Sequence, residues 1–251
     1  MKQIDDGTSL FMTRKRRLAG WLVHMFTASG AFVGVLALVA ISQQKLIVAL
    51  WLMSAAIVID AVDGWFARII QVKWVVPAID GALLDNIVDF FNYTMVPSFF
   101  LLMTHLIPDA WRYVCVAAII FSSGYQFTQV DAKTEDHFFK GFPSYWNIVV
   151  FYLFFWQMNT WVNLVILLVL AFLSFVPIKY VYPSRLDYLT RNKPLRLGML
   201  AATVAWGLAA IGLLLIYPAS NAFLVFISIG YLILYVVISL HRTWVPLHSD
   251  G

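Results

Sequence analysis

The sequence predicts an all-α integral membrane protein. Of its 251 residues, 62% are hydrophobic and only 12% are charged, whereas about 25% of the residues of an ordinary soluble domain are charged. Apolar stretches recur along almost the whole chain, and a helix needs about 20 such residues to cross a hydrocarbon layer about 30 Å thick. Segments such as residues 164–175 are apolar on all sides and lack the alternation of β-barrel strands. The spanning elements are therefore expected to be helices.

We expect about eight transmembrane helices within a single membrane domain, residues 1–251. Short polar or Pro-containing segments separate most of them, and the longer polar stretches are residues 69–79, 128–143 and 179–196. Because exposed connections carry most binding and catalytic groups, the side with the longer loops is expected to be the working face. The expected helices are residues 19–41, 46–70, 79–106, 111–127, 144–159, 161–178, 197–216 and 221–240.

The basic residues set the expected orientation. If the N-terminus is cytoplasmic, almost every Lys and Arg falls in a cytoplasmic segment, and only Lys45 and Arg112 fall on the opposite side. Both termini and the working face are then cytoplasmic. The net charge of +4 follows from this asymmetry and from attraction to anionic headgroups, so nucleic acid is not an expected partner. The basic N-terminal run resembles a signal peptide, but its apolar stretch is too long, and we expect it to be retained.

The second expected helix ends in a stripe of polar and small residues. Asp60, Asp63, Gly64, Ala67 and Arg68 fall on one face of a helix, because residues three or four apart are neighbours on its surface. Ionisable side chains within a span are unfavourable by a few kcal/mol, roughly 2.5–3.5 on insertion scales, and usually mark function. This face is therefore a candidate functional site.

The third expected helix carries a matching acidic stripe. Gly81, Asp85 and Asp89 are spaced by four residues on a helix antiparallel to the second. Carboxylates brought together repel one another unless a divalent cation lies among them. Oxygen ligands favour Mg²⁺, Mn²⁺ or Ca²⁺ over zinc, and Mg²⁺ or Mn²⁺ suits phosphoryl chemistry. The two stripes thus predict a metal site.

Two other uses of these charges stay open. The intramembrane Asp and Arg residues could form ion pairs that only hold the helices together, for example Asp63 with Arg68, although four aspartates exceed the nearby cations. The carboxylates could also belong to an ion or proton pathway, as in a small cation transporter, although they cluster near one membrane face. The single Cys115 excludes an intramolecular disulfide.

Both stripes together resemble the signature of the CDP-alcohol phosphatidyltransferases, Asp-x-x-Asp-Gly-x-x-Ala-Arg followed by Gly-x-x-x-Asp-x-x-x-Asp. Every fixed position of that signature is present between Asp60 and Asp89. The resemblance implies that Asp60, Asp63 and Asp85 hold two Mn²⁺ or Mg²⁺ ions on the diphosphate of CDP-diacylglycerol, with Asp89 completing the metal site and acting as general base. The resemblance further implies that CDP-diacylglycerol is bound by Thr27, Gly64, Ala67, Arg68 and Gly81. We add Lys140 to this group.

The spacing between the two stripes points to one branch of that family. Twelve residues, 69–80, separate Arg68 from Gly81, where about eight are common in the family. This departure, and two helices beyond a six-helix core, resemble the bacterial branch that uses choline. The core would be residues 19–178 and the additional helices residues 197–240. The implied partners are CDP-diacylglycerol and choline as substrates and CMP and phosphatidylcholine as products, in a bacterial cytoplasmic membrane, with a homodimer as a further expectation.

The acceptor-binding residues are the least constrained by the sequence. A quaternary ammonium group binds aromatic faces by cation–π attraction, sometimes beside a carboxylate. Candidates near the expected cytoplasmic helix ends are Tyr93, Tyr125, Glu135, Tyr145 and Trp146. Because 16% of the chain is aromatic and Tyr and Trp gather at membrane interfaces in any case, each has an alternative structural role. Serine, inositol phosphate or glycerol phosphate stay open as alternative acceptors, each phosphorylated one requiring a basic pocket.

Overall fold

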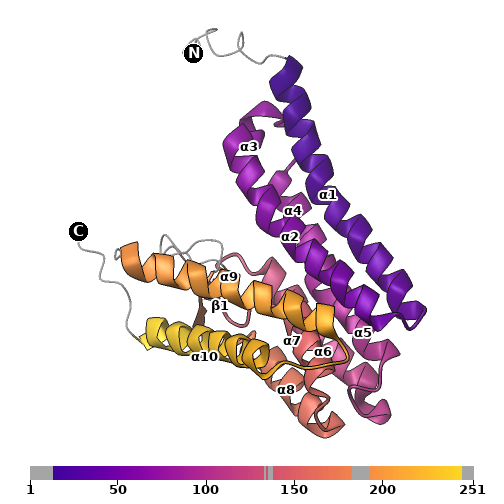
Figure 1. Cartoon of the computed structure of the whole chain (residues 1–251). Helices are drawn as coiled ribbons and strands as arrows, with labels where there is room; N and C mark the ends of the chain where they lie inside the picture. The colour runs from indigo at the N-terminus through magenta and orange to yellow at the C-terminus, as the bar shows by residue number, and fades with distance from the viewer. Residues whose placement is uncertain (1–13, 133, 135–137, 183–192, 245–251) are drawn as a thin grey trace. The chain divides into compact units, whose positions relative to one another are not determined.

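The structure is a computed structural model that describes residues 14–132, 134, 138–182 and 193–244. These residues are almost entirely helical and divide into two compact units, residues 1–96 and 97–251. The all-α membrane class is confirmed. Figure 1 shows the helices in chain order. The first unit contains α1 (Arg14–Ser42), α2 (Leu46–Ile70), α3 (Val72–Val75), α4 (Gly81–Phe90) and the π-helix η2 (Phe91–Met95).

The second unit contains the remaining elements, and α5 begins at the boundary between the units. Its two short strands pair antiparallel, with Phe139 opposite Tyr180 and Lys140 opposite Lys179. The elements are α5 (Val96–Met103), η3 (Asp109–Trp111), α6 (Arg112–Thr128), β1 (Phe139–Lys140), α7 (Trp146–Trp156), α8 (Thr160–Leu173), β2 (Lys179–Tyr180), α9 (Lys193–Ile216) and α10 (Ala222–Trp244).

A helical segment lies within each of the eight expected spans. Four of them, α1, α2, α9 and α10, are long and apolar enough to cross a membrane, while α7 and α8 are shorter apolar helices. The chain is therefore a multi-pass membrane protein, and the number eight stays a prediction. Several expected boundaries were wrong by a few residues: α1 begins at Arg14, so the basic cluster lies in its first turn, and α8 ends at Leu173.

The third expected span is interrupted by a π-helix. It runs through α4, η2 and α5, which have ten, five and eight residues. A π-turn inserts one extra residue into the helical repeat and is frequent at functional sites. Here the insertion directly follows the acidic stripe, and three consecutive residues of η2, Asn92, Tyr93 and Thr94, are buried.

Small residues let α1 pack closely on α2 and α4. A side chain at Gly34 would place its Cβ 2.2 Å from Asn92 Oδ1 and 2.7 Å from Phe91 Cε1. Gly30 faces Val88 and Asn92 in the same way, and its carbonyl accepts a hydrogen bond of 3.0 Å from Asn92 Nδ2. In a membrane, helix association depends on such close packing because lipid supplies no hydrophobic drive. Helix α1 is thereby held against the helices that carry the aspartates.

The turn between α2 and α4 has more structure than the expected loop 69–79. Helix α2 ends at Ile70 and is capped by Gln71, whose left-handed backbone (φ 56°) lets its N–H bond back to the carbonyls of Ala67 and Arg68. The short helix α3 follows. Asp80 then caps α4, with its carboxylate accepting from the N–H groups of Ala82 and Leu83 at 3.1 Å each. These caps fix where both acidic stripes begin and end.

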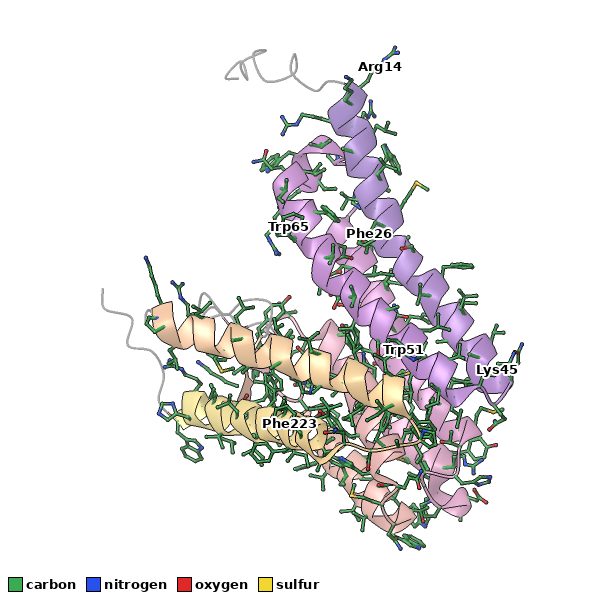
Figure 2. All side chains as sticks on the ribbon, in the orientation of Figure 1. Arg14, Phe26, Lys45, Trp51, Trp65 and Phe223 are labelled. Atoms are coloured by element: carbon green, nitrogen blue, oxygen red, sulfur yellow. The ribbon has the colours of Figure 1, made fainter. Side chains whose placement is uncertain are left out.

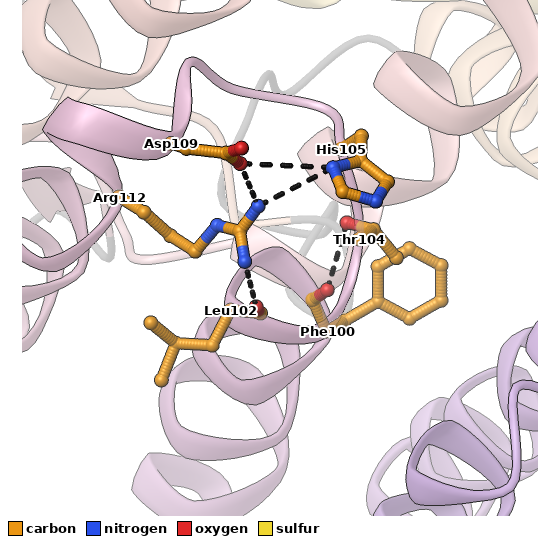
Figure 3. Close-up of polar contacts among 6 residues, drawn as sticks. All are labelled: Phe100, Leu102, Thr104, His105, Asp109 and Arg112. Atoms are coloured by element: carbon orange, nitrogen blue, oxygen red, sulfur yellow. Dashed lines mark hydrogen bonds and ion pairs between the residues drawn. The ribbon is translucent and has the colours of Figure 1, made fainter.

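Charged groups mark the ends of the helices. Figure 2 shows Arg14 at the start of α1 and Lys45 beyond its other end, where α2 begins. Figure 3 shows the polar cluster at the start of α6, where Arg112 donates to the Leu102 carbonyl at 2.9 Å and to Asp109, and His105 Nδ1 lies 3.6 Å from Asp109 Oδ1. This cluster ties η3 and α6 to the end of α5.

Candidate metal centre in the first unit

Three aspartates from α2 and α4 meet in the first unit. Carboxylate oxygens of Asp60, Asp85 and Asp89 all lie within 4.8 Å of one another, and each residue is half-buried. The four-residue spacing of Asp85 and Asp89 puts both on the face of α4 that meets the end of α2. The two acidic stripes therefore face each other, as the sequence predicts.

This group of oxygens fits a divalent cation. An ion that binds oxygen at about 2.1 Å can hold two ligand oxygens up to about 4.2 Å apart. The carboxylate oxygens would therefore need to move only slightly closer to bind one ion, and their present separation suits two adjacent ions. All three groups are hard carboxylate ligands, which suit Mg²⁺ or Mn²⁺ better than zinc. Like charges this close also repel strongly without a cation among them. The donor set thus matches the expected metal chemistry.

Asp63 lies outside the group of three, although it was expected among the metal ligands. Its side chain is only 4% exposed, and it accepts hydrogen bonds from the Thr27 hydroxyl and the backbone of Gly64. Asp63 also interacts electrostatically with Asp60 and Arg68. It therefore borders the cluster, held from α1, and Thr27, expected near the nucleotide, is placed against this carboxylate. Its metal-binding role stays a prediction.

The remaining residues of the signature surround the aspartates. Gly64 and Ala67 are half-buried and Arg68 is exposed on the last turn of α2. A Cβ on Gly81 would lie 3.1 Å from the imidazole of His24, so α4 begins tightly against α1. Arg68 attracts the Asp63 carboxylate electrostatically, so a stabilising role for this pair stays open beside the metal site.

Tyr93 has a contact that the sequence interpretation did not include. Its hydroxyl donates to Asp60 Oδ2 at 2.6 Å, and the residue is 8% exposed. We expected Tyr93 at the choline site and assigned it no link to the metal ligands. The spacing contains the missed signal, since Tyr93 follows Gly81, Asp85 and Asp89 at the same interval of four.

Three of the other acceptor candidates make aromatic contacts within the second unit. Tyr125 is exposed and its ring lies 4.8 Å from that of Phe175. Tyr145 is half-buried beside Phe139. Trp146 is fully buried, and its indole N–H donates to Ser123 at 2.7 Å, which favours a packing role. Glu135 lies outside the described residues.

Lys140, expected to contact the donor, forms an ion pair in the second unit. Its Nζ lies 2.6 Å from Asp131 Oδ2. The hydrogen bond from Lys140 lowers the pKa of Asp131, and the same bond raises the pKa of Lys140. The ammonium group is therefore partly committed to a neighbouring carboxylate.

Comparisons with known proteins identify the family. The family profile described as CDP-alcohol phosphatidyltransferase matches residues 21–176, which include both acidic stripes. The chain belongs to this family. It is 48% identical over 236 residues to "Phosphatidylcholine synthase" of Legionella pneumophila, covering 94% of this chain and 92% of that protein. Proteins of the same name from Legionella bozemanae and Borreliella burgdorferi are 47% and 40% identical, over 86% and 67% of this chain and 100% and 72% of their own lengths.

Proposed function

We propose that this protein is a phosphatidylcholine synthase, which transfers the phosphatidyl group of CDP-diacylglycerol to choline and releases CMP. The observation that carries the proposal is the similarity to a protein of that name from Legionella pneumophila over 94% of this chain, at 48% identity. That similarity extends beyond residue 176, where the family profile ends. The twelve residues between Arg68 and Gly81 support the same assignment.

The carboxylates of Asp60, Asp85 and Asp89 would hold two Mn²⁺ or Mg²⁺ ions, with Asp63 at their border. Bound ions would neutralise the diphosphate of the donor and stabilise the charge that develops as CMP leaves. The oxygens within 4.8 Å of one another support this role. Thr27 keeps Asp63 oriented through its hydroxyl, so α1 contributes to the site as well as α2 and α4.

The transfer itself requires a base and an open approach to phosphorus. The Asp89 carboxylate takes the proton of the choline hydroxyl as the choline oxygen bonds to the phosphorus that carries diacylglycerol, and the bond from that phosphorus to the CMP oxygen breaks. General bases contribute about 10²–10⁴-fold to such steps. Gly64 and Ala67 would leave room for the nucleotide, and Gly81, which begins α4 against His24, stays a predicted contact of the donor. Arg68 would supply positive charge for phosphate oxygens, and the same role for Lys140 of the second unit stays a prediction.

Choline would be recognised by aromatic faces rather than by a basic pocket. We propose the ring of Tyr93 as the candidate in the unit that holds the aspartates, while Tyr125, Tyr145, Trp146 and Glu135 of the second unit stay predictions. Cation–π contacts are stronger where water is excluded, about 2 kcal/mol or more against about 0.5–1 kcal/mol at exposed sites. Tyr93 is the buried member of this set within the same unit as the aspartates.

The proposed location is the bacterial cytoplasmic membrane, with both termini and the active site cytoplasmic. The basic residues at the start of α1 support this orientation. Diacylglycerol chains can then stay in the leaflet while the nucleotide and choline approach from the cytoplasm. A homodimer stays a prediction.

A headgroup competition assay tests the proposal. Purified protein in mixed micelles with CDP-diacylglycerol and Mn²⁺ receives choline, serine, inositol phosphate or glycerol phosphate, and lipid product and CMP are both measured. We expect CMP release and phosphatidylcholine formation when choline is the acceptor, and no product with the other three acceptors. Lipid product with another acceptor and none with choline would show that choline is not the acceptor, while the reaction class would stay the same.

A further inference from the structure

Tyr93 joins the third helical segment to a carboxylate of the second. Its phenol oxygen lies 2.6 Å from Asp60 Oδ2, a short distance for a hydrogen bond between hydroxyl and carboxylate. The bond connects residues 33 positions apart in the chain. Because Asp60 is one of the three clustered aspartates, this contact reaches directly into the candidate metal centre.

The surroundings of Tyr93 hold its side chain in place. Its neighbours Asn92 and Thr94 are 6% and 0% exposed, and Asn92 Nδ2 anchors η2 to the Gly30 carbonyl of α1. The ring of Tyr93, which is itself 8% exposed, therefore lies in a buried segment that is anchored to α1. A buried tyrosine requires a partner for its hydroxyl, and Asp60 supplies it.

We propose that Tyr93 is a positioning residue for the metal site, which fixes the orientation of the Asp60 carboxylate for the cation. The proposal rests on the proposed function only in taking the aspartates as metal ligands. A hydrogen-bond donor that holds one carboxylate oxygen leaves the other oxygen directed at the ion. Partners of this kind orient metal ligands, and losing one typically lowers metal affinity or activity by about 10- to 100-fold.

This role differs from the choline-binding role that the ring alone would serve. Cation–π attraction uses the aromatic face and does not require the hydroxyl, whereas the bond to Asp60 uses only the hydroxyl. Tyr93→Phe removes the hydroxyl and keeps the ring. The two roles are therefore separable in one variant.

The experiment measures Mn²⁺ binding directly on purified protein, from the electron paramagnetic resonance signal of free Mn²⁺, with turnover measured in parallel. For Tyr93→Phe we expect Mn²⁺ affinity to fall by about 10- to 100-fold, turnover to recover as Mn²⁺ is raised, and the choline KM at saturating Mn²⁺ to stay close to wild type. Tyr113→Phe is the matched control, because Tyr113 is 78% exposed on α6, and its Mn²⁺ affinity should not change.

A double-mutant cycle separates positioning from a general loss of structure. In an Asp60→Asn background, Tyr93→Phe should cause little further loss of Mn²⁺ affinity, because the contact is already altered. Unchanged Mn²⁺ affinity in Tyr93→Phe, or an equal loss in both backgrounds, would overturn the proposal. Weakened Mn²⁺ binding in Tyr93→Phe together with a wild type that makes no phosphatidylcholine would instead uphold it and overturn the proposed function.

Discussion

The two units differ in how the polar side chains within their helices are arranged. In the first unit, Asp60, Asp85 and Asp89 bring like charges within 4.8 Å of one another. In the second, the hydroxyl of Tyr152 bonds to Ser228 and accepts from the indole of Trp206 at 2.7 Å. The second arrangement joins neutral groups that satisfy one another, whereas the first concentrates charge of one sign. Charge clustered in this way inside a membrane destabilises the fold and indicates function.

The strongest test of this contrast removes one charge from the cluster. Asp85→Asn or Asp89→Asn should lower turnover by about 10²–10⁴-fold or more, because each removes a metal ligand or the general base. Thermal unfolding of the purified variants in detergent should match wild type or exceed it, since a repulsive charge is gone.

Asp109→Asn is the matched control for these variants. Asp109 is exposed and pairs with Arg112 and His105 in the second unit, so its loss should leave turnover unchanged. Aggregation of Asp85→Asn and Asp89→Asn on extraction would show that these carboxylates hold the helices together, and the contrast between the units would then fail.

Helix packing in the first unit should be the next most sensitive feature. Gly34→Ala places a Cβ 2.2 Å from Asn92 Oδ1 and 2.7 Å from Phe91 Cε1, so these side chains of η2 must shift, and overpacking of this kind typically destabilises by about 1–3 kcal/mol. Because η2 carries Tyr93, we also expect weaker Mn²⁺ binding. Thermal unfolding and Mn²⁺ titration measure the two effects.

Gly124→Ala in α6 is the counterpart with the opposite expected sign. A Cβ there meets no atom within 4 Å among the described residues, and alanine is favoured over glycine in a helix by about 1 kcal/mol. The variant should therefore be as stable as wild type or more stable. Equal destabilisation by both substitutions would refute close packing as the reason for Gly34.

The polar network of the second unit should give a smaller and purely structural effect. Tyr152→Phe removes the hydroxyl shared by Ser228 and Trp206. Hydrogen bonds between membrane helices average about 0.6 kcal/mol and reach about 1.7 kcal/mol, so we expect a loss of that order in thermal unfolding. Mn²⁺ affinity should not change. A large loss of Mn²⁺ affinity in Tyr152→Phe would mean that the network serves the metal site.

Sequence patterns predicted the helices and the facing stripes because hydrophobic length and four-residue spacing are local properties. They did not predict η2, since its extra residue leaves no mark in the hydrophobic period, nor α3. Spacing identifies a face of a helix but not the contacts that each residue of that face makes, so it did not show that Tyr93 bonds to Asp60 or that Asp63 meets Thr27. The close approach of Gly30 and Gly34 of α1 to Asn92 of η2 was likewise beyond the reach of the pattern.

The smallest effect is expected at the ion pair between Lys140 and Asp131. Lys140 lowers the pKa of Asp131, so the contribution of that carboxylate to stability is present above its unfolded pKa, about 4, and is lost as pH falls through the lower folded value. The pKa of Lys140 is raised, so the contribution of its ammonium group to stability is present below the unfolded pKa, about 10.5. That contribution is lost as pH rises through the higher folded value.

Because Asp131 is exposed, salt and water screen the pair. Asp131→Asn should therefore shift thermal unfolding only slightly at neutral pH and not at all at pH 2 or in high salt. Lys140→Gln should match Asp131→Asn if the lysine serves only the pair. A KM for CDP-diacylglycerol that rises in Lys140→Gln and falls or stays constant in Asp131→Asn would instead show Lys140 acting on the donor.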